Sequence, residues 1–242
     1  MTTAIIPLAG KSSRFATLTS TPKWALKIGD SSILELALES LSRSRLSLDR
    51  FVFVVRLEHT SLAEELIHKA NLSSTEFVPL PYTPNGQARS VEIGLRRAEV
   101  QGPFLVWNGD THLKKGWDYE LDVQNRWLLL SKLLGDHWSF ASTTDNLVTK
   151  TSEKVRISDL ASLGLYAFAS PEEYFAALDE YQGEGEQYVA PLYNSLIDQG
   201  LPVEAHVIDS SYMVPLGTPS EVAESCRLNK WPLPEQLRSW PK

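Results

Sequence analysis

The chain has 242 residues, of which 43% are hydrophobic and 22% are charged. These values lie close to the globular average and exclude disordered, collagen-like and coiled-coil proteins. With 23 basic and 30 acidic residues the net charge is −7, which argues against nucleic acid or an anionic membrane as the main partner. At roughly 150 residues per domain, this length suits one large α/β domain or two small ones.

The cysteine content indicates the compartment. Cys226 is the only cysteine, so an internal disulfide is excluded and a cytoplasmic protein is expected. No apolar run approaches the roughly 18 residues of a membrane span, and the first residues have no signal-peptide pattern. The five histidines show no metal-ligand spacing, so the sequence supports no zinc site.

The first half of the chain alternates between apolar strands and amphipathic helices. The hydrophobic pattern predicts strands at residues 4–8, 51–55, 76–80 and 104–107, and helices at 32–41, 62–70 and 86–98. This alternation with short loops predicts a parallel sheet covered by helices on both faces. Ligands of such sheets bind at the carboxyl ends of the strands, where three polar segments occur. They are the loop after Leu8, the Pro84-Asn85-Gly86 turn and Asp110.

The second half is less regular. Strands are predicted at residues 137–142, 164–168, 203–208 and 212–216, and helices at 171–181, 188–198 and 219–228. No linker separates the two halves, so the second half is expected to be a lid or subdomain on the same sheet. The tail from Trp231 onward holds three prolines and is expected to run irregularly over the surface.

The loop after the first strand is the first candidate binding segment. It reads Leu8-Ala9-Gly10-Lys11-Ser12-Ser13-Arg14-Phe15 and is followed by Pro22-Lys23. Backbone N–H groups in such a loop can form an anion-binding nest, with Arg supplying a planar fork and Lys a point charge. The loop has neither the Walker spacing nor the three-glycine dinucleotide pattern. Taken alone, it fits a phosphate site and a solvated surface loop equally well.

The motif Leu-Ala-Gly-x-x-Ser-Arg-Phe after a first strand, followed by Pro-Lys, resembles the signature of the sugar-phosphate nucleotidyltransferases. Further segments resemble this family in the same order along most of the chain. They are Pro84-Asn85-Gly86-Gln87-Ala88, Trp107-Asn108-Gly109-Asp110, Glu153-Lys154, the segment 162–168, Glu186-Gln187-Tyr188-Val189 and Leu216-Gly217-Thr218-Pro219. Each match alone is weak, but the ordered set is specific. The segments 137–140 and 188–196 look most like a short branch found in capsule and lipopolysaccharide pathways.

The resemblance implies a single-domain nucleotide-diphospho-sugar transferase fold, which is Rossmann-like α/β with a central mixed sheet flanked by helices. Residues 1–115 would form the nucleotide-binding half, 116–230 the half for the sugar or acceptor phosphate, and 231–242 the irregular tail. The implied enzyme is an Mg²⁺-dependent nucleotidyltransferase. It joins a nucleoside triphosphate, with a pyrimidine favoured, to a sugar 1-phosphate or similar monoester and releases pyrophosphate. Capsule or surface-polysaccharide precursors are the implied products, and homo-oligomerisation stays open.

The resemblance also assigns roles to four charged residues. Arg14 would grip the phosphates that leave, Lys23 would neutralise the α-phosphate or the attacking phosphate, Asp110 would hold Mg²⁺ and Lys154 would meet the sugar phosphate. The alternatives are that Arg14 forms a surface ion pair, that Lys154 is an exposed strand lysine and that Asp110 is a turn residue. The implied nucleotide-binding residues are Leu8, Ala9, Gly10, Ser12, Ser13, Arg14, Pro84, Asn85, Gly86, Gln87 and Asn108. The implied acceptor-binding residues are Gly164, Tyr166, Glu186 and Lys154. Trp24 and Trp107 are expected in the core.

Two positions depart from the family pattern. Ser12 stands where the loop usually has a second glycine, and its Cβ limits positive φ. Pro215 stands where many members have a second metal-binding aspartate, so a two-carboxylate site is in doubt. We predict that Asp209, the nearest alternative, is a turn residue. A glycosyltransferase of related fold stays open, although the chain has no Asp-x-Asp motif, and so does a non-catalytic nucleotide-binding regulatory domain.

Overall fold

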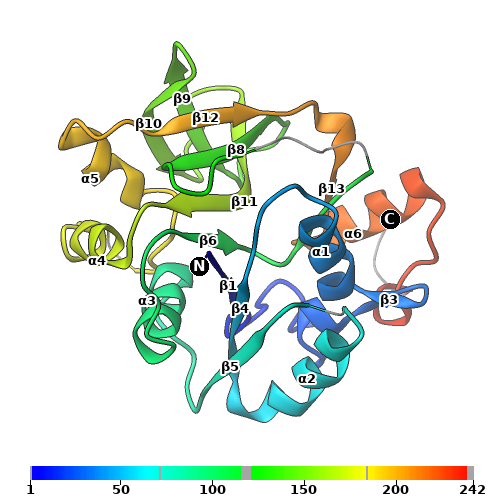
Figure 1. Ribbon diagram of the computed structural model, residues 1–242. Coiled ribbons are helices and arrows are strands. Elements are labelled where there is room, and N and C mark those ends of the chain that lie inside the picture. Colours follow the sequence, from blue (N-terminus) through cyan, green and yellow to red (C-terminus); the bar gives the residue numbers. More distant parts are fainter. Residues whose placement is uncertain (1, 71, 116–120, 184, 239–242) are drawn as a thin grey trace.

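A mixed nine-stranded sheet forms the centre of the computed structural model, which describes residues 2–70, 72–115, 121–183 and 185–238 (Figure 1). The strand order across it is β5-β4-β1-β6-β11-β8-β12-β10-β9. The strands of the first half are β1 (Thr3–Pro7), β4 (Arg50–Arg56), β5 (Thr75–Leu80) and β6 (Phe104–Trp107). Those of the second half are β8 (Trp127–Lys132), β9 (Ser139–Thr144), β10 (Leu147–Glu153), β11 (Leu160–Phe168) and β12 (Glu204–Val207).

The four strands of the first half are mutually parallel, as the sequence predicts. Strand β1 pairs with β4 on one side and β6 on the other, and β4 pairs with β5. Their buried, β-branched and aromatic residues suit a sheet that is covered on both faces. Parallel pairing brings the carboxyl ends of these strands to one edge, where the three predicted polar segments lie.

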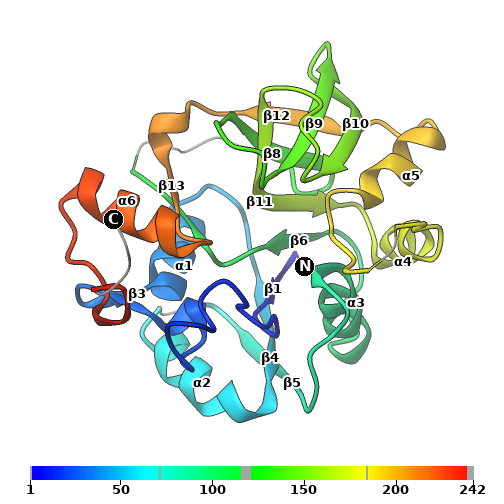
Figure 2. The same cartoon turned by 180° about the vertical axis from the view of Figure 1, so that it is seen from behind.

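Helices cover both faces of the sheet, as expected (Figure 2). One core cluster packs helices α1 (Ile33–Ser42) and α2 (Thr60–His68) against one face. The other packs α3 (Gln87–Arg97), α4 (Pro171–Asp179) and α5 (Leu192–Asp198) against the opposite face. Ser32 caps α1, because its Oγ accepts from the Glu35 N–H at 3.1 Å and the Glu35 carboxylate accepts from the Ser32 N–H at 2.6 Å.

Antiparallel strand β11 joins the two halves of the chain into one sheet. It pairs with β6 through Leu165 opposite Trp107, and with β8 through Tyr166 opposite Leu128. The register shifts between Ser162 and Tyr166, so this strand bends where it passes the carboxyl end of β6. The mixed sheet expected from the family resemblance is confirmed.

Several element predictions for the second half differ from the structure. Strands β8 and β10 were not predicted, and helix α5 begins at Leu192 rather than at residue 188 because Pro191 directly precedes it. The predicted strand 212–216 is β13 (Met213–Pro215), which lies outside the central sheet. It pairs with β7 (Thr111–Leu113) and places Pro215 opposite Thr111.

A third core cluster covers the carboxyl-terminal region. Helix α6 (Pro219–Asn229) shares this cluster with Ile28 of strand β2 (Lys27–Ile28), which pairs with β3 (Ser31–Ser32), and with the start of the tail. The tail is not wholly superficial, since Leu237 is buried in the turn η4 (Glu235–Leu237). Residues 239–242 of the predicted tail and residues 116–120, with which the predicted second half begins, lie outside the described residues. Among the described residues, no helix has the length and apolarity that a membrane span requires.

Candidate active site

A cavity of about 510 Å³ opens at the carboxyl edge of the parallel strands. Its walls come from the loop after β1, the turn after β5, the end of β6, and strands β9 to β11 of the second half. All the predicted site residues line it except Ala9, which is fully buried in the core. The Ala9 side chain therefore packs in the core, and its predicted role in nucleotide binding stays a prediction.

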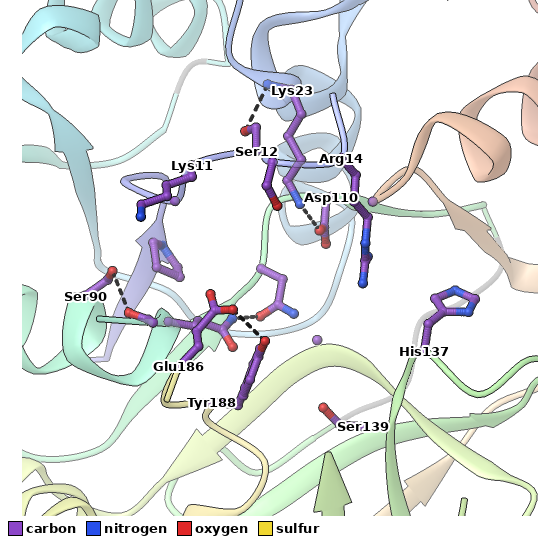
Figure 3. Close-up of a pocket in the computed structure, with 18 of the residues that line it drawn as sticks. Lys11, Ser12, Arg14, Lys23, Ser90, Asp110, His137, Ser139, Glu186 and Tyr188 are labelled. Atoms are coloured by element: carbon purple, nitrogen blue, oxygen red, sulfur yellow. Dashed lines mark hydrogen bonds and ion pairs between the residues drawn. The ribbon is translucent and has the colours of Figure 1, made fainter. Parts of the chain in front are cut away.

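The loop after β1 presents both backbone donors and a cation to the cavity. Within the described part of the chain, no hydrogen bond uses the backbone N–H groups of residues 10–14, which leaves them free for a ligand or solvent. Ser12 adopts a φ of +50°, so it takes the left-handed conformation that a glycine would adopt there. Arg14 is exposed and extends into the opening (Figure 3). Ser12 thus adopts positive φ despite its Cβ.

Lys23 and Asp110 form an ion pair on the floor of the cavity. The Lys23 Nζ donates to Asp110 Oδ2 at 2.5 Å, and Figure 3 shows the two side chains pointing toward each other. The Lys23 N–H donates to Ser12 Oγ at 3.3 Å, which ties the lysine to the loop. Trp24 is buried as expected, and its indole N–H donates to the Leu8 carbonyl at 3.2 Å. These contacts hold the loop, Lys23 and Asp110 as one unit.

The turn at residues 84–87 is held against the segment 185–187. Gly86 has a φ of +97°, and a Cβ there would lie 2.3 Å from the Gln187 carbonyl oxygen. The Ala88 N–H donates to that same oxygen at 2.9 Å, and the Asn85 side-chain amide donates to the Gly185 carbonyl at 3.0 Å. A glycine is therefore required at residue 86. The Gln87 side chain reaches across to donate to Asn108, which fastens the turn to the end of β6.

Polar side chains of the second half form the opposite wall. Lys154 donates to the Tyr188 hydroxyl and lies 4.2 Å from the ring centroid, and that hydroxyl donates to Glu186 at 2.6 Å. Gly164 has a φ of +81°, and a Cβ there would lie 2.5 Å from the Asn108 amide nitrogen. The wall therefore offers one ammonium group, one phenol and carboxylates to a ligand.

Glu153 is an acid that the sequence reasoning left out of the site. Burial raises the pKa of its carboxyl, while a hydrogen bond from Ser139 and the charge of Lys154 pull this pKa down. Burial likewise raises the pKa of the Tyr188 hydroxyl, and Glu186 adds to that shift. The sequence held a signal for Glu153, because it directly precedes Lys154, which was already predicted to be a site residue.

Asp110 lies beside Gly217 and Glu221, two further residues that the sequence reasoning did not assign. The Leu216 N–H donates to the Asp110 carbonyl at 2.9 Å. A Cβ at Gly217 would lie 3.1 Å from Asp110 Oδ2 and 3.3 Å from Glu221 Oε2. Glu221 Oε1 is 2.6 Å from His137 Nε2. The chain order gave no sign of this grouping, because Glu221 lies in the first turn of a helix, where an acid commonly serves the helix itself.

Asp209 lies away from this grouping. It caps the turn η3 (Ser210–Tyr212), its Oδ1 accepts from the Ser211 N–H at 2.8 Å, and this hydrogen bonding lowers the pKa of its carboxyl. Its side chain does not line the cavity. The prediction that Asp209 is a turn residue is confirmed.

The oxygen donors around Asp110 fit a hard divalent cation. Within the residues described, no group of three or more His, Cys, Asp or Glu side chains gathers as a metal site. Magnesium does not need such a group, because it often takes one or two carboxylates and completes its shell with water and substrate phosphates. The gap at Gly217, which a Cβ would fill, lies against the Asp110 carboxylate. Asp110 is therefore the residue that could hold Mg²⁺.

Comparison with protein-family models and with curated protein sequences gives no match. Among solved structures, the nucleoside-diphosphate-sugar pyrophosphorylase from Vibrio cholerae RC9 shares 31% identity, with 93% of this chain and 99% of that chain covered and a TM-score of 0.82. The inositol-1-phosphate CTP transferase from T. maritima has 15% identity, 99% and 97% coverage and a TM-score of 0.77. A UDP-glucose pyrophosphorylase complexed with UDP-glucose has 14% identity, 95% and 98% coverage and a TM-score of 0.79.

The two likenesses at 14% and 15% identity show the fold alone. The likeness to the Vibrio cholerae protein is also one of sequence, at 31% identity over 93% of this chain. The predicted motifs of the family line one cavity, with Arg14, Lys23 and Asp110 on one wall and Lys154 and Glu186 on the other. On this similarity the chain belongs to the sugar-phosphate nucleotidyltransferases, the enzymes that join a nucleotidyl group to a phosphorylated sugar or a related acceptor.

Proposed function

We propose that this enzyme transfers a nucleotidyl group from a pyrimidine nucleoside triphosphate to a sugar 1-phosphate or a similar phosphate monoester, in an Mg²⁺-dependent reaction. The observation that carries the proposal is that positively charged side chains line two opposite walls of one cavity. Arg14 and Lys23 lie on the side of the parallel strands, and Lys154 lies on the opposite wall. Two phosphorylated substrates can therefore meet between them.

The nucleotide end follows from the loop after β1. Free N–H groups at residues 10–14 and the fork of Arg14 suit the β- and γ-phosphates, which leave as pyrophosphate. The turn at Gly86 and Gln87 lies beside this loop and offers backbone groups to a base edge. A pyrimidine is favoured by the likeness of this turn to those of pyrimidine-specific enzymes. The solved neighbours named for CTP and UDP-glucose agree with that preference.

The acceptor end follows from the second half. Lys154 would bind the acceptor phosphate, while Glu153, Glu186 and the Tyr188 hydroxyl would bind hydroxyl groups of a sugar or polyol. Tyr166 and Gly164 of β11 also line this wall, and glycine at residue 164 leaves the space that the Asn108 side chain occupies. These residues recognise a hydroxylated phosphate monoester.

In the reaction, an oxygen of the acceptor phosphate forms a bond to the α-phosphorus, and the bond from that phosphorus to the β-phosphate oxygen breaks. The acceptor phosphate is already ionised, so no general base is required. The chain itself supplies positioning and charge neutralisation, with Lys23 at the α-phosphate, Arg14 at the leaving group and Lys154 at the nucleophile. When bound at Asp110, Mg²⁺ supplies further neutralisation of phosphate charge.

The products would be nucleotide-activated precursors of capsule or other surface polysaccharides, made by one folded domain in the cytoplasm. The likeness of residues 137–140 and 188–196 to that short branch supports the pathway. The single cysteine, Cys226, and the use of nucleoside triphosphates support the compartment.

The test is a grid of nucleoside triphosphates against sugar 1-phosphates and small phosphates with Mg²⁺, with pyrophosphate as the readout. We expect pyrophosphate only when a pyrimidine nucleotide and an acceptor are both present, and only with Mg²⁺. Cleavage of a ready-made sugar nucleotide with transfer of its sugar would instead indicate a glycosyltransferase. Nucleotide binding without turnover for any acceptor would indicate a regulatory domain.

A further inference from the structure

The family resemblance implies a second metal-binding aspartate at the position of Pro215, where this chain has no carboxylate. Pro215 occupies that position, and the structure places it beside Asp110, since Pro215 pairs with Thr111 and the Leu216 N–H donates to the Asp110 carbonyl. A proline has no side-chain ligand. The question is which residue, if any, faces Asp110 across the space that the missing aspartate would have filled.

Glu221 faces that space from the first turn of helix α6. Its Oε2 and the Oδ2 of Asp110 lie 3.3 Å and 3.1 Å from a single point, the position that a Cβ would take at Gly217. Glycine at residue 217 therefore keeps open a gap that borders two carboxylate oxygens. Glu221 is largely buried, with 11% of its side chain exposed, and it lines the cavity. A helix turn thus brings an acid to Asp110 from six residues beyond Pro215.

His137 holds the Glu221 carboxylate in this orientation. Its Nε2 lies 2.6 Å from Oε1, while the other oxygen, Oε2, faces the gap. Carboxylates that bind metals are commonly oriented by such an outer hydrogen bond. The Thr218 hydroxyl also accepts from the Glu221 N–H at 3.2 Å, which fixes the helix start. Both ends of the residue are therefore held before any ligand binds.

The ion pair between Lys23 and Asp110 does not prevent Asp110 from binding a metal cation at this gap. It donates to Asp110 Oδ2 at 2.5 Å, but an ionised carboxylate has about four acceptor sites on its two oxygens. Asp110 can accept from Lys23 and still present a lone pair to the gap. Two facing carboxylates with room for water and phosphate oxygens match the ligand number that magnesium takes from proteins.

We propose that Glu221 is the second carboxylate of the divalent-cation site and takes over the place that Pro215 vacates. Asp110 and Glu221 would both hold the cation at the gap beside Gly217, and His137 positions Glu221. The inference rests on the proposed Mg²⁺ requirement and adds to it a ligand that the motif pattern does not contain.

The test measures cation binding without turnover. Mn²⁺ alone, an oxygen-seeking substitute for Mg²⁺, is titrated into the full chain, and free Mn²⁺ is followed by electron paramagnetic resonance. The wild type should bind one Mn²⁺, and Glu221→Gln and Asp110→Asn should each weaken that binding roughly tenfold or more, by analogy with other lost interactions at metal sites. Gly217→Ala should do the same, because its methyl group occupies the gap.

Glu224→Gln is the matched control, since Glu224 lies on the same helix, is exposed and pairs with Arg227 at 2.5 Å. It should bind Mn²⁺ like the wild type, and melting temperatures of all variants check that they fold. Equal Mn²⁺ affinity of Glu221→Gln and Glu224→Gln overturns the proposal, as does a wild type that binds no Mn²⁺ at millimolar concentration. If Asp110→Asn alone loses Mn²⁺, the cation site stands without Glu221. If no substrate pair releases pyrophosphate, the proposed function fails, whatever the Mn²⁺ result.

Discussion

Lys23 and Asp110 are 87 positions apart in the chain, yet they form one ion pair at 2.5 Å on the floor of the cavity. Each was predicted from its own motif, and each motif follows a buried strand of the parallel part of the sheet. What the motifs could not specify is the direct contact, because that depends on how β1 and β6 pair. The chemistry of single residues here therefore depends on strand register.

Asp110→Asn should abolish turnover and leave the fold intact. The amide has a similar shape but is a poor magnesium ligand, and a metal carboxylate contributes several kcal/mol to the transition state. The folded protein loses one partly exposed ion pair, which is typically worth about 1 kcal/mol or less. Steady-state pyrophosphate release and the melting temperature measure the two effects. Asp209→Asn is the control and should keep turnover within roughly tenfold, because Asp209 only caps a turn.

Arg14→Ala should weaken binding of the nucleoside triphosphate by roughly 1.5–3 kcal/mol, the scale of a charge-assisted hydrogen bond. Arg14→Lys should restore only part of this loss, because an ammonium group lacks the bidentate fork. Calorimetric titration measures both variants. Arg97→Ala is the control, because the Arg97 side chain donates to the Pro79 carbonyl outside the cavity. This variant should bind the nucleoside triphosphate as the wild type does. Unchanged affinity in Arg14→Ala would exclude the loop as the phosphate site.

Glu153→Gln should stabilise the protein at neutral pH. Burial raises the pKa of Glu153 in the folded state, so its favourable contribution is present below its ordinary pKa of 4.5 and is lost as the pH rises through the folded-state pKa. At pH 7 a neutral isostere removes this penalty. We therefore expect Glu153→Gln to melt at a higher temperature than the wild type at pH 7. The gain should vanish below pH 4.5.

Glu92→Gln is the control of opposite sign. Glu92 on α3 is exposed to 15%, close to the 16% of Glu153. Burial also pushes its pKa up, but hydrogen bonds and charge from Arg89 and Arg96 outweigh this and leave the pKa lowered. Its stabilising contribution is therefore present at neutral pH and lost as the pH falls, so Glu92→Gln should lower the melting temperature at pH 7. A Glu153→Gln protein that melts lower than the wild type at pH 7 would contradict the argument.

At the scale of elements, regular periodicity and clear caps made the first half predictable. Strand 104–107 is where the sequence places it, and the predicted helix 32–41 is α1 (Ile33–Ser42). Strand β8 was missed although its apolar residues 127–130 directly follow a turn, in which the Asp122 carboxylate accepts from the Gln124 N–H at 2.9 Å. Strand β10 was missed because its exposed residues alternate weakly. Side-chain pattern predicts an element well only when its burial is regular.

Gly86→Ala should disrupt the link between the turn before α3 and the segment 185–187. A Cβ there would meet the backbone of Gln187 at 2.3 Å, which cannot move without breaking the Ala88–Gln187 hydrogen bond. Gly102→Ala is the control, because Gly102 also has positive φ, +71°, but open space around it. The control should lose about 1–2 kcal/mol for the left-handed backbone alone. Gly86→Ala should lose about 2 kcal/mol more and bind nucleotide weakly, as measured by denaturant unfolding and titration.

At the scale of the whole molecule, one sheet runs through both halves of the chain. Strands β6 and β11 join at the cavity, so the nucleotide wall and the acceptor wall share the same hydrogen-bonded frame. The sequence predicted the residues of both walls because they lie in motifs. It could not predict Glu221 or His137, whose proximity arises only when α6 packs beside β13 and the segment before β9 reaches it. Contacts made by tertiary packing leave no local pattern.

This shared frame makes nucleotide binding a test of the whole assembly. A ligand at 100 times its Kd stabilises the folded state by about 2.7 kcal/mol, which corresponds to about 5–11 °C at 2–4 °C per kcal/mol. We expect CTP, UTP or dTTP with Mg²⁺ to raise the melting temperature by this amount in a single transition, because the sheet unfolds as one unit.

GTP and ATP should shift the melting temperature less at equal concentration, and Arg14→Ala should lose most of the shift. Stabilisation by a purine nucleotide alone would reject the pyrimidine preference. Two separate transitions, of which nucleotide moves only one, would reject the single folding unit.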